Sequence, residues 1–105
     1  MSTDIYIPNR WVVIKIDGEE PVYKVFAMWS GGYLDGDSWQ LNSGIVDVVD
    51  DKDYWDFIGH SGSVYHCRKT SYDMTVYGAG ILTSMMNKSD NISIMDEDTD
   101  WENLI

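Results

Sequence analysis

Two neighbouring runs of β-branched and aromatic residues constrain the fold more than any other feature of this sequence. Residues 11–16 read W-V-V-I-K-I and residues 22–29 read V-Y-K-V-F-A-M-W, and both runs are too short and too rich in valine and isoleucine to favour a helix. Between them, Asp17 and Gly18 begin a turn that continues to Pro21. The sequence therefore predicts a β-hairpin at the start of the chain.

Four more short strands are expected after this hairpin, separated by turn residues. They occupy residues 38–41, 45–49, 54–58 and 64–68. Strands that recur every eight to twelve residues are typical of antiparallel folds. We expect a meander or small barrel of five to six strands, preceded by a lead-in over residues 1–9.

The apolar pattern changes to helical spacing between Met74 and Met86, which predicts one amphipathic helix. Ser71 or Asp73 could cap its start, whereas Gly78 and Gly80 lower its helical propensity. The fold class is therefore α+β, with residues 1–89 as a single globular domain and residues 90–105 as an acidic, mobile tail. The expected core comprises Val12, Ile14, Val25, Val46, Val48, Phe57, Tyr65, Ile81 and Leu82.

Acidic residues greatly outnumber basic ones, 18 against 7, so the formal net charge is −11. Nucleic acid and anionic membranes should repel such a chain, whereas a protein with a basic or nucleic-acid-binding surface would attract it. One acidic group surrounds the hairpin between residues 45 and 58: Asp47, Asp50, Asp51, Asp53 and Asp56. The other lies in the tail: Asp96, Glu97, Asp98, Asp100 and Glu102. Together they could imitate the charge of a nucleic-acid backbone; the alternative is that each cluster is simply a solvated surface.

No motif indicates an enzyme, a cofactor or a metal. Cys67 is the only cysteine, so the chain cannot form an internal disulfide. Its neighbour His66 should point to the opposite face of a strand and so cannot activate it. The second histidine, His60, is not at metal-ligand spacing from His66. We therefore expect a non-enzymatic protein.

A second kind of site is suggested by aromatic residues interleaved with glycine and serine turns. These rings and backbone amides could line a pocket for a planar ligand such as a nucleotide, with an arginine near its phosphate. The ordinary alternative is that the rings form the core of a small sheet. The candidate residues are Trp29, Gly31, Gly32, Tyr33, Trp39, Ser61, Ser63, Tyr65 and Arg68.

Three stretches resemble small proteins encoded by tailed bacteriophages: N-R-W-V-V-I-K-I, Y-K-V-F-A-M-W-S-G-G-Y-L-D-G-D-S-W-Q-L-N-S-G-I and H-S-G-S-V-Y-H-C-R-K. The resemblance spans residues 9–85 and carries no functional residues with it. It implies a context, because small phage accessory proteins are often inhibitors of host or defence machinery.

These observations favour an accessory protein that binds and inhibits a bacterial target in the host cytoplasm. The start of the sequence has no signal-peptide pattern, and no membrane span is expected. One alternative is a small-molecule sponge that sequesters a nucleotide signal. Another is a structural or assembly subunit of a phage particle, which would form homo-oligomers.

Overall fold

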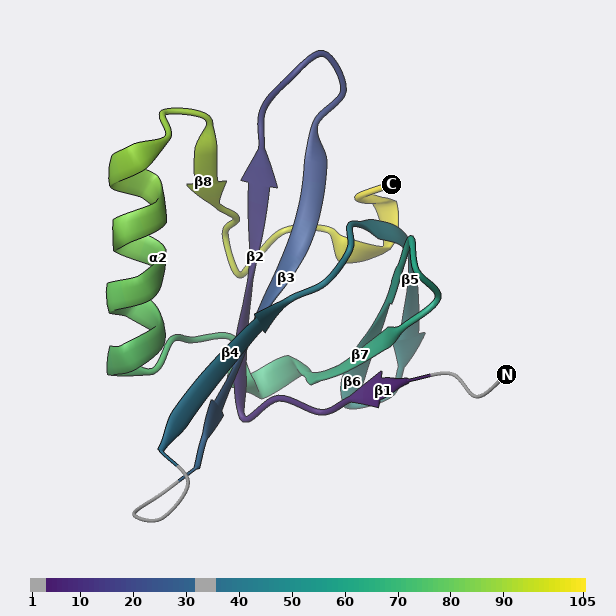
Figure 1. Ribbon diagram of the computed structural model, residues 1–105. Helices are drawn as coiled ribbons and strands as arrows, with labels where there is room; N and C mark the ends of the chain where they lie inside the picture. Colours follow the sequence, from purple (N-terminus) through teal and green to yellow (C-terminus); the bar gives the residue numbers. More distant parts are fainter. Residues whose placement is uncertain (1–3, 32–35) are drawn as a thin grey trace.

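The computed structural model describes residues 4–31 and 36–105, which form two four-stranded sheets and one α-helix in three layers (Figure 1). The α+β class is confirmed, but the strands form two packed open sheets instead of one meander or a closed barrel. The strands are β1 (Ile5–Tyr6), β2 (Arg10–Ile16), β3 (Val22–Ser30), β4 (Asp37–Leu41), β5 (Ile45–Asp51), β6 (Tyr54–Gly59), β7 (Val64–Arg68) and β8 (Ile92–Ile94). The helix is α2 (Val76–Lys88), and two short 3-10 helices are η1 (Lys69–Ser71) and η2 (Trp101–Asn103).

The central sheet has the strand order β4-β3-β2-β8 and is antiparallel throughout. The outer sheet has the order β1-β7-β6-β5, in which only the β1–β7 pair is parallel. All six expected strands are present, and the β2–β3 hairpin pairs continuously from Arg10 opposite Met28 to Ile16 opposite Val22. The strands that the sequence did not predict are β1 and β8.

Strand β2 is buried on both faces because it lies between the helix and the outer sheet (Figure 1). Trp11 and Val13 pack toward the outer sheet, whereas Val12 and Ile14 pack toward α2, and all four are at most 2% exposed. Burial on both faces accounts for the unbroken apolar run in the sequence. A strand with one solvent-facing side would alternate apolar and polar residues instead.

Helix α2 begins two residues later than the apolar pattern suggested. Its N-cap is Thr75, whose Oγ1 accepts a hydrogen bond from the backbone N–H of Gly78 at 2.9 Å, so the expected cap at Ser71 or Asp73 is wrong. Gly78 lies directly on Met28 of the central sheet, where a side chain would not fit without movement. Within the described residues, no helix combines the length and apolar character that crossing a membrane requires.

Residues 90–105 are part of the fold, which contradicts the expectation of a mobile tail. Strand β8 pairs with β2, and the Met95 N–H donates to the Val13 carbonyl at 2.8 Å. The Tyr72 hydroxyl donates to the Met95 carbonyl and accepts from the Val13 N–H, which continues the connection between the two segments. Trp101 is 4% exposed and packs in the core between the sheets. The apolar residues of this segment therefore dock it onto the sheets despite its acidic composition.

The expected core is largely confirmed, with one error. Six of the nine residues are buried: Val12, Ile14, Val25, Phe57, Tyr65 and Leu82. Val48 and Ile81 are partly buried and pack against the core. Val46 is 48% exposed because the β5–β6 register shifts between Ile45 and Asp47, so that Ile45 takes the inward position. Such an irregularity moves the following residue to the other face of the strand.

Candidate functional site

The solvent-facing surface of the outer sheet, here called the outer face, carries three of the ten expected acidic residues. The inward positions of its strands are set by Phe57, Tyr65 and Cys67, all of which are at most 1% exposed. Because side chains alternate along a strand, the residues between them project to solvent. The outer face therefore displays Asp47, Val49, Asp51, Tyr54, Asp56, Ile58, Val64, His66 and Arg68.

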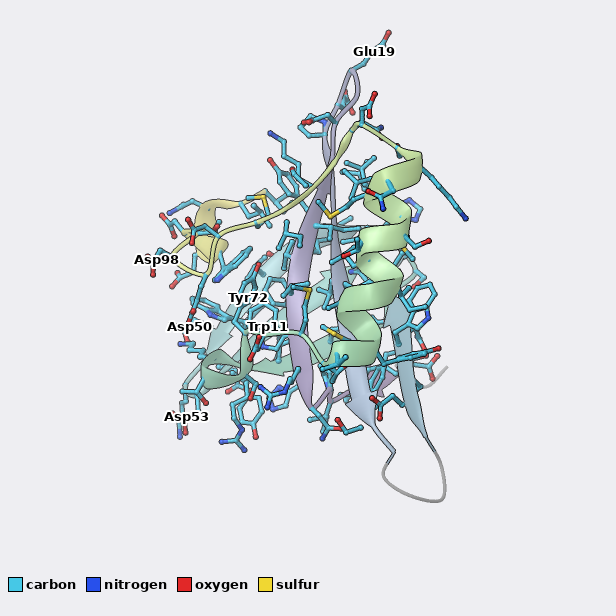
Figure 2. All side chains as sticks on the ribbon, turned by 90° about the vertical axis from the view of Figure 1, so that its left-hand side faces the viewer. Trp11, Glu19, Asp50, Asp53, Tyr72 and Asp98 are labelled. Carbon is cyan, nitrogen blue, oxygen red and sulfur yellow. The ribbon has the colours of Figure 1, made fainter. Side chains whose placement is uncertain are left out.

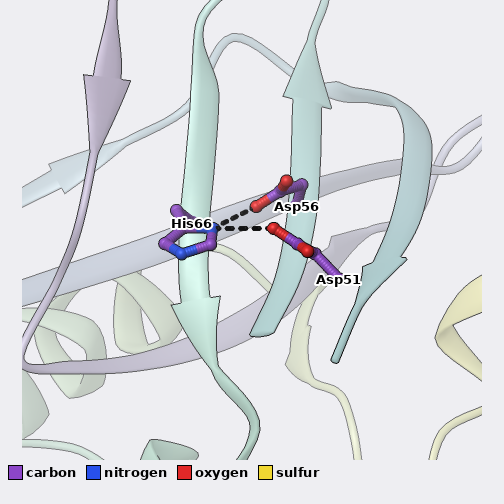
Figure 3. A group of neighbouring side chains, drawn as sticks. All are labelled: Asp51, Asp56 and His66. Atoms are coloured by element: carbon purple, nitrogen blue, oxygen red, sulfur yellow. Dashed lines mark hydrogen bonds and ion pairs between the residues drawn. The ribbon is translucent and has the colours of Figure 1, made fainter. Parts of the chain in front are cut away.

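Asp51, Asp56 and His66 form a compact cluster on this face, one residue from each of three adjacent strands (Figure 3). Asp56 lies directly opposite His66 in the β6–β7 register, and its Oδ1 contacts the His66 Nδ1. The Asp51 Oδ2 lies 4.0 Å from the same nitrogen. The Tyr54 ring stacks on the imidazole with a centroid distance of 3.8 Å and an interplanar angle of 11°, which fixes the orientation of the imidazole. This is the one group among the described residues that could hold a metal ion, and it was not predicted from the sequence.

Two basic residues at the end of β7 are already engaged with neighbours. Arg68 donates to the Tyr54 hydroxyl at 2.8 Å, and its guanidinium lies 5.0 Å from the centre of that ring. The Lys69 ammonium lies 2.6 Å from Asp50 and 4.3 Å from the centre of the Trp55 ring. Of the five hairpin aspartates, Asp50 alone forms an ion pair with a lysine or arginine among the described residues. The hairpin therefore keeps most of its negative charge.

The second acidic group is fixed beside the first because Trp101 anchors its segment. The Trp101 ring lies 5.9 Å from Phe57 of β6, and η2 contacts β5. Figure 2 shows Asp50, Asp53 and Asp98 projecting from the same side of the molecule, while Glu19 lies at the far end of the β2–β3 hairpin. We call the first side the acidic side and define it by Asp50, Asp53 and Asp98. Of the other predicted residues, Asp47, Asp51 and Asp56 lie on the outer face.

Cys67 has the properties of a core residue. It is fully buried between the sheets, and burial raises the pKa of its thiol well above the ordinary value, which favours the protonated form. His66 projects to the opposite face of β7, as its position next to Cys67 predicted. The imidazole cannot therefore reach the thiol to remove its proton.

Of the nine residues proposed for a nucleotide pocket, the seven that the structure describes do not converge. Trp29 packs toward the outer sheet against Tyr6, with ring centroids 6.4 Å apart, whereas Trp39 stacks on Phe26 beneath the helix at 5.3 Å. These two tryptophans lie on opposite faces of the central sheet and cannot line one pocket. Gly32 and Tyr33 are outside the described residues. The others are scattered: Gly31 follows β3, Ser61 and Ser63 lie in the β6–β7 turn, Tyr65 is buried and Arg68 is on the outer face.

A cavity of about 500 Å³ lies elsewhere, between the β2–β3 turn, the start of β5 and the last residues of the chain. Its size is within the usual range for small-molecule sites. It contains one carboxylate, one imidazole and no lysine or arginine. The lining residues are Glu20, Pro21, Val22, Tyr23, Ser43, Gly44, Ile45, Val46, His60, Leu104 and Ile105.

Comparisons with protein-family models, with curated proteins and with solved structures found no match. A function for this chain is therefore inferred from its own structure and sequence.

Proposed function

We propose that this chain is a non-enzymatic binding protein that inhibits a bacterial host or defence protein through its acidic side. The observation that carries the proposal is the arrangement of residues from two acidic segments, far apart in the sequence, on one side of a small fold (Figure 2). The resemblance to tailed-phage accessory proteins supports a bacterial target. The charge supports a target with a basic surface, such as a nucleic-acid-binding site.

Most of the negative charge on the acidic side is not neutralised by nearby lysine or arginine side chains among the described residues. Lys52 lies at the tip of the β5–β6 hairpin, and Lys69 is paired with Asp50. Asp53 and Asp98 form no ion pair with a lysine or arginine among the described residues, so the acidic side keeps a negative field that speeds the encounter with a basic partner. Exposed charges are screened over roughly 8 Å at physiological ionic strength, so this attraction should weaken as salt is added.

The test is quantitative capture of target proteins from a bacterial lysate over a salt series. Asp53 and Asp98 are exposed, and no side-chain ion pair or hydrogen bond links them to other described residues. The double variant Asp53→Asn/Asp98→Asn should therefore reduce capture without affecting folding. Its matched control is Glu19→Gln/Asp90→Asn, which removes the same charge away from the acidic side, near the β2–β3 turn. Glu19 lies in that turn (Figure 2), and the residue after Asp90, Asn91, accepts a backbone hydrogen bond from Asp17, which directly follows β2.

We expect the acidic-side variant to lower the association rate with the captured target severalfold more than the control does, because surface charges mainly affect association rates. DNA added to the complex should release the target if the acidic side occupies a nucleic-acid-binding surface. Equal effects of the two variants would contradict the proposal, because only net charge would then matter. Capture that is indifferent to salt would contradict it as well.

Sequestration of a nucleotide ranks second as a function. The cavity beside the β2–β3 turn has a suitable volume, but Glu20 contributes the only carboxylate of its lining and His60 the only basic group. A phosphate would meet no lysine or arginine there. A nucleotide at a hundred times its Kd would add about 2.7 kcal/mol to the free energy of unfolding. A rise of that size in thermal unfolding assays, with no captured protein, would reverse the ranking.

A further inference from the structure

We propose that Asp51, Asp56 and His66 form a binding site for a first-row divalent metal ion, for which Zn²⁺ is the probe. One imidazole nitrogen and two carboxylate oxygens converge on the outer face, and all three potential ligand atoms lie within 4.8 Å of one another. This inference does not depend on the acidic side having a protein partner, because it concerns the isolated chain.

The pairing of the strands brings the members of the cluster together. Asp56 and His66 are paired directly across β6 and β7, and Asp51 ends β5 on the far side of β6 (Figure 3). The side chains of His66 and Asp56 are each 23% exposed, whereas that of Asp51 is 53% exposed. Two ligands are therefore held by the sheet, and the third, next to the hairpin tip, is free to adjust.

The excess negative charge of the cluster favours a cation over a simple ion pair. Both carboxylates approach the same His66 nitrogen, yet Nδ1 carries at most one proton and can donate it to only one of them. Arg68 and Lys69, which follow His66 closely in the chain, are engaged elsewhere, Arg68 with Tyr54 and Lys69 with Asp50. In the part of the chain that the structure describes, neither Asp51 nor Asp56 forms an ion pair with lysine or arginine. A divalent ion would satisfy both carboxylates at once.

The donor set indicates the class of metal. Imidazole suits zinc and other first-row transition ions, whereas sites for Mg²⁺ and Ca²⁺ are built from oxygen ligands. Zinc binds such nitrogen and oxygen ligands at about 2.0–2.2 Å, so ligands of one ion lie roughly 3–4 Å apart. The 4.0 Å separation of the Asp51 and His66 atoms is compatible with that spacing. Three protein ligands leave at least one coordination position for water or for a donor from a partner.

The experiment is isothermal titration of the purified chain with Zn²⁺, accompanied by the absorption spectrum of the Co²⁺ form and a parallel titration with Mg²⁺. The site variants are His66→Gln and Asp51→Asn. The matched controls are His60→Gln, which removes the other histidine, an exposed one, and Asp53→Asn, which removes a hairpin carboxylate outside the cluster. Far-UV circular dichroism of each variant verifies the fold.

We expect one Zn²⁺ to bind per chain, with affinity reduced at least tenfold in both site variants and unchanged in both controls. Mg²⁺ should bind much more weakly than Zn²⁺. The inference is overturned if Zn²⁺ shows no saturable binding, or if His66→Gln and Asp51→Asn bind it as well as the native chain does. Equal losses in the controls would also overturn it, since they would indicate nonspecific attraction to an acidic surface. Because Asp51 is exposed, the Asp51→Asn variant remains informative even if His66→Gln fails to fold.

Discussion

Replacing Trp101 by alanine tests the most consequential difference between sequence and structure, the docking of residues 90–105. The Trp101 ring is 4% exposed and meets three aromatic neighbours, with centroid distances of 5.8 Å to Trp11, 5.9 Å to Phe57 and 5.7 Å to Tyr72. Truncation removes this contact area and leaves a cavity between the sheets. Such tryptophan or phenylalanine truncations in cores cost about 3–5 kcal/mol.

That cost is a large share of the stability of a domain of this size, which is typically about 5–15 kcal/mol. Each kcal/mol lowers the melting temperature of a domain of roughly 100 residues by about 4 °C or more. The Trp101→Ala variant should therefore melt at least about 12 °C below the native chain. A mobile tail would instead give a change near zero, because surface substitutions usually alter stability by less than about 0.5 kcal/mol.

The assay is urea unfolding followed by far-UV circular dichroism, since the loss of a tryptophan would itself alter the fluorescence signal. The matched control is Glu102→Ala, an exposed neighbour in the same short helix. It should leave the unfolding midpoint nearly unchanged. If Trp101→Ala lowers the free energy of unfolding by less than about 1 kcal/mol, the docking of this segment is wrong.

Three further predictions concern the packing and backbone of the fold. Gly78→Ala should lower the free energy of unfolding by about 1–3 kcal/mol, because its Cβ would overlap the Met28 sulfur. Gly80→Ala has open space and should raise that free energy by up to about 1 kcal/mol, so changes of equal sign in urea unfolding would contradict this. Lys52 has a φ of 58°, a backbone angle that glycine adopts more easily than alanine does. Lys52→Gly and Lys52→Ala lose the same charge, and Lys52→Gly should be the more stable of the two by about 1 kcal/mol. Equal urea midpoints for the two variants would contradict this. Burial raises the pKa of Tyr72 from 10.0 to about 12, so the unfolded chain loses the hydroxyl proton at a lower pH than the folded chain does. The free energy of unfolding should therefore fall as pH rises from 10 toward 12. Tyr72→Phe should flatten that decline, and an unchanged dependence on pH would refute the burial of this hydroxyl.

The sequence predicted the strands well because each strand carries its own local signal. Residues 11–16 and 22–29 contain β-branched and aromatic runs bounded by turn residues, and they fold as the central hairpin. The second buried face of β2 was not predicted, although an unbroken apolar run is the usual sign of a strand covered on both sides. What packs against each face of a strand is determined by the whole fold. The sequence of the strand alone does not reveal it.

The errors occurred where distant contacts override local pattern. Val46 was assigned inward by strict alternation, and the register shift beside Ile45 reverses it. The segment after Asp90 was expected to be mobile because it is acidic, yet Trp101 and Met95 attach it to the core and to β2. An acidic composition describes the solvent-facing side chains of such a segment, whereas its few apolar residues determine whether it docks.

The Asp51, Asp56 and His66 cluster shows what sequence reasoning could have found and why it did not. No metal site was predicted because the two histidines are not at ligand spacing from each other; His60 lies in the β6–β7 turn and His66 in β7. The informative comparison is across strands: Asp56 and His66 are equally far from the centre of the turn at residue 61, so pairing in this hairpin places them opposite each other. Pairing in the β5–β6 hairpin places Asp51 opposite Tyr54, which lies two residues before Asp56 on the same face of β6, so Asp51 is a diagonal neighbour of Asp56. Strand pairing in hairpins thus brings potential metal ligands together on a sheet. Rules based on the sequence spacing of ligands in helices and loops do not detect such a site.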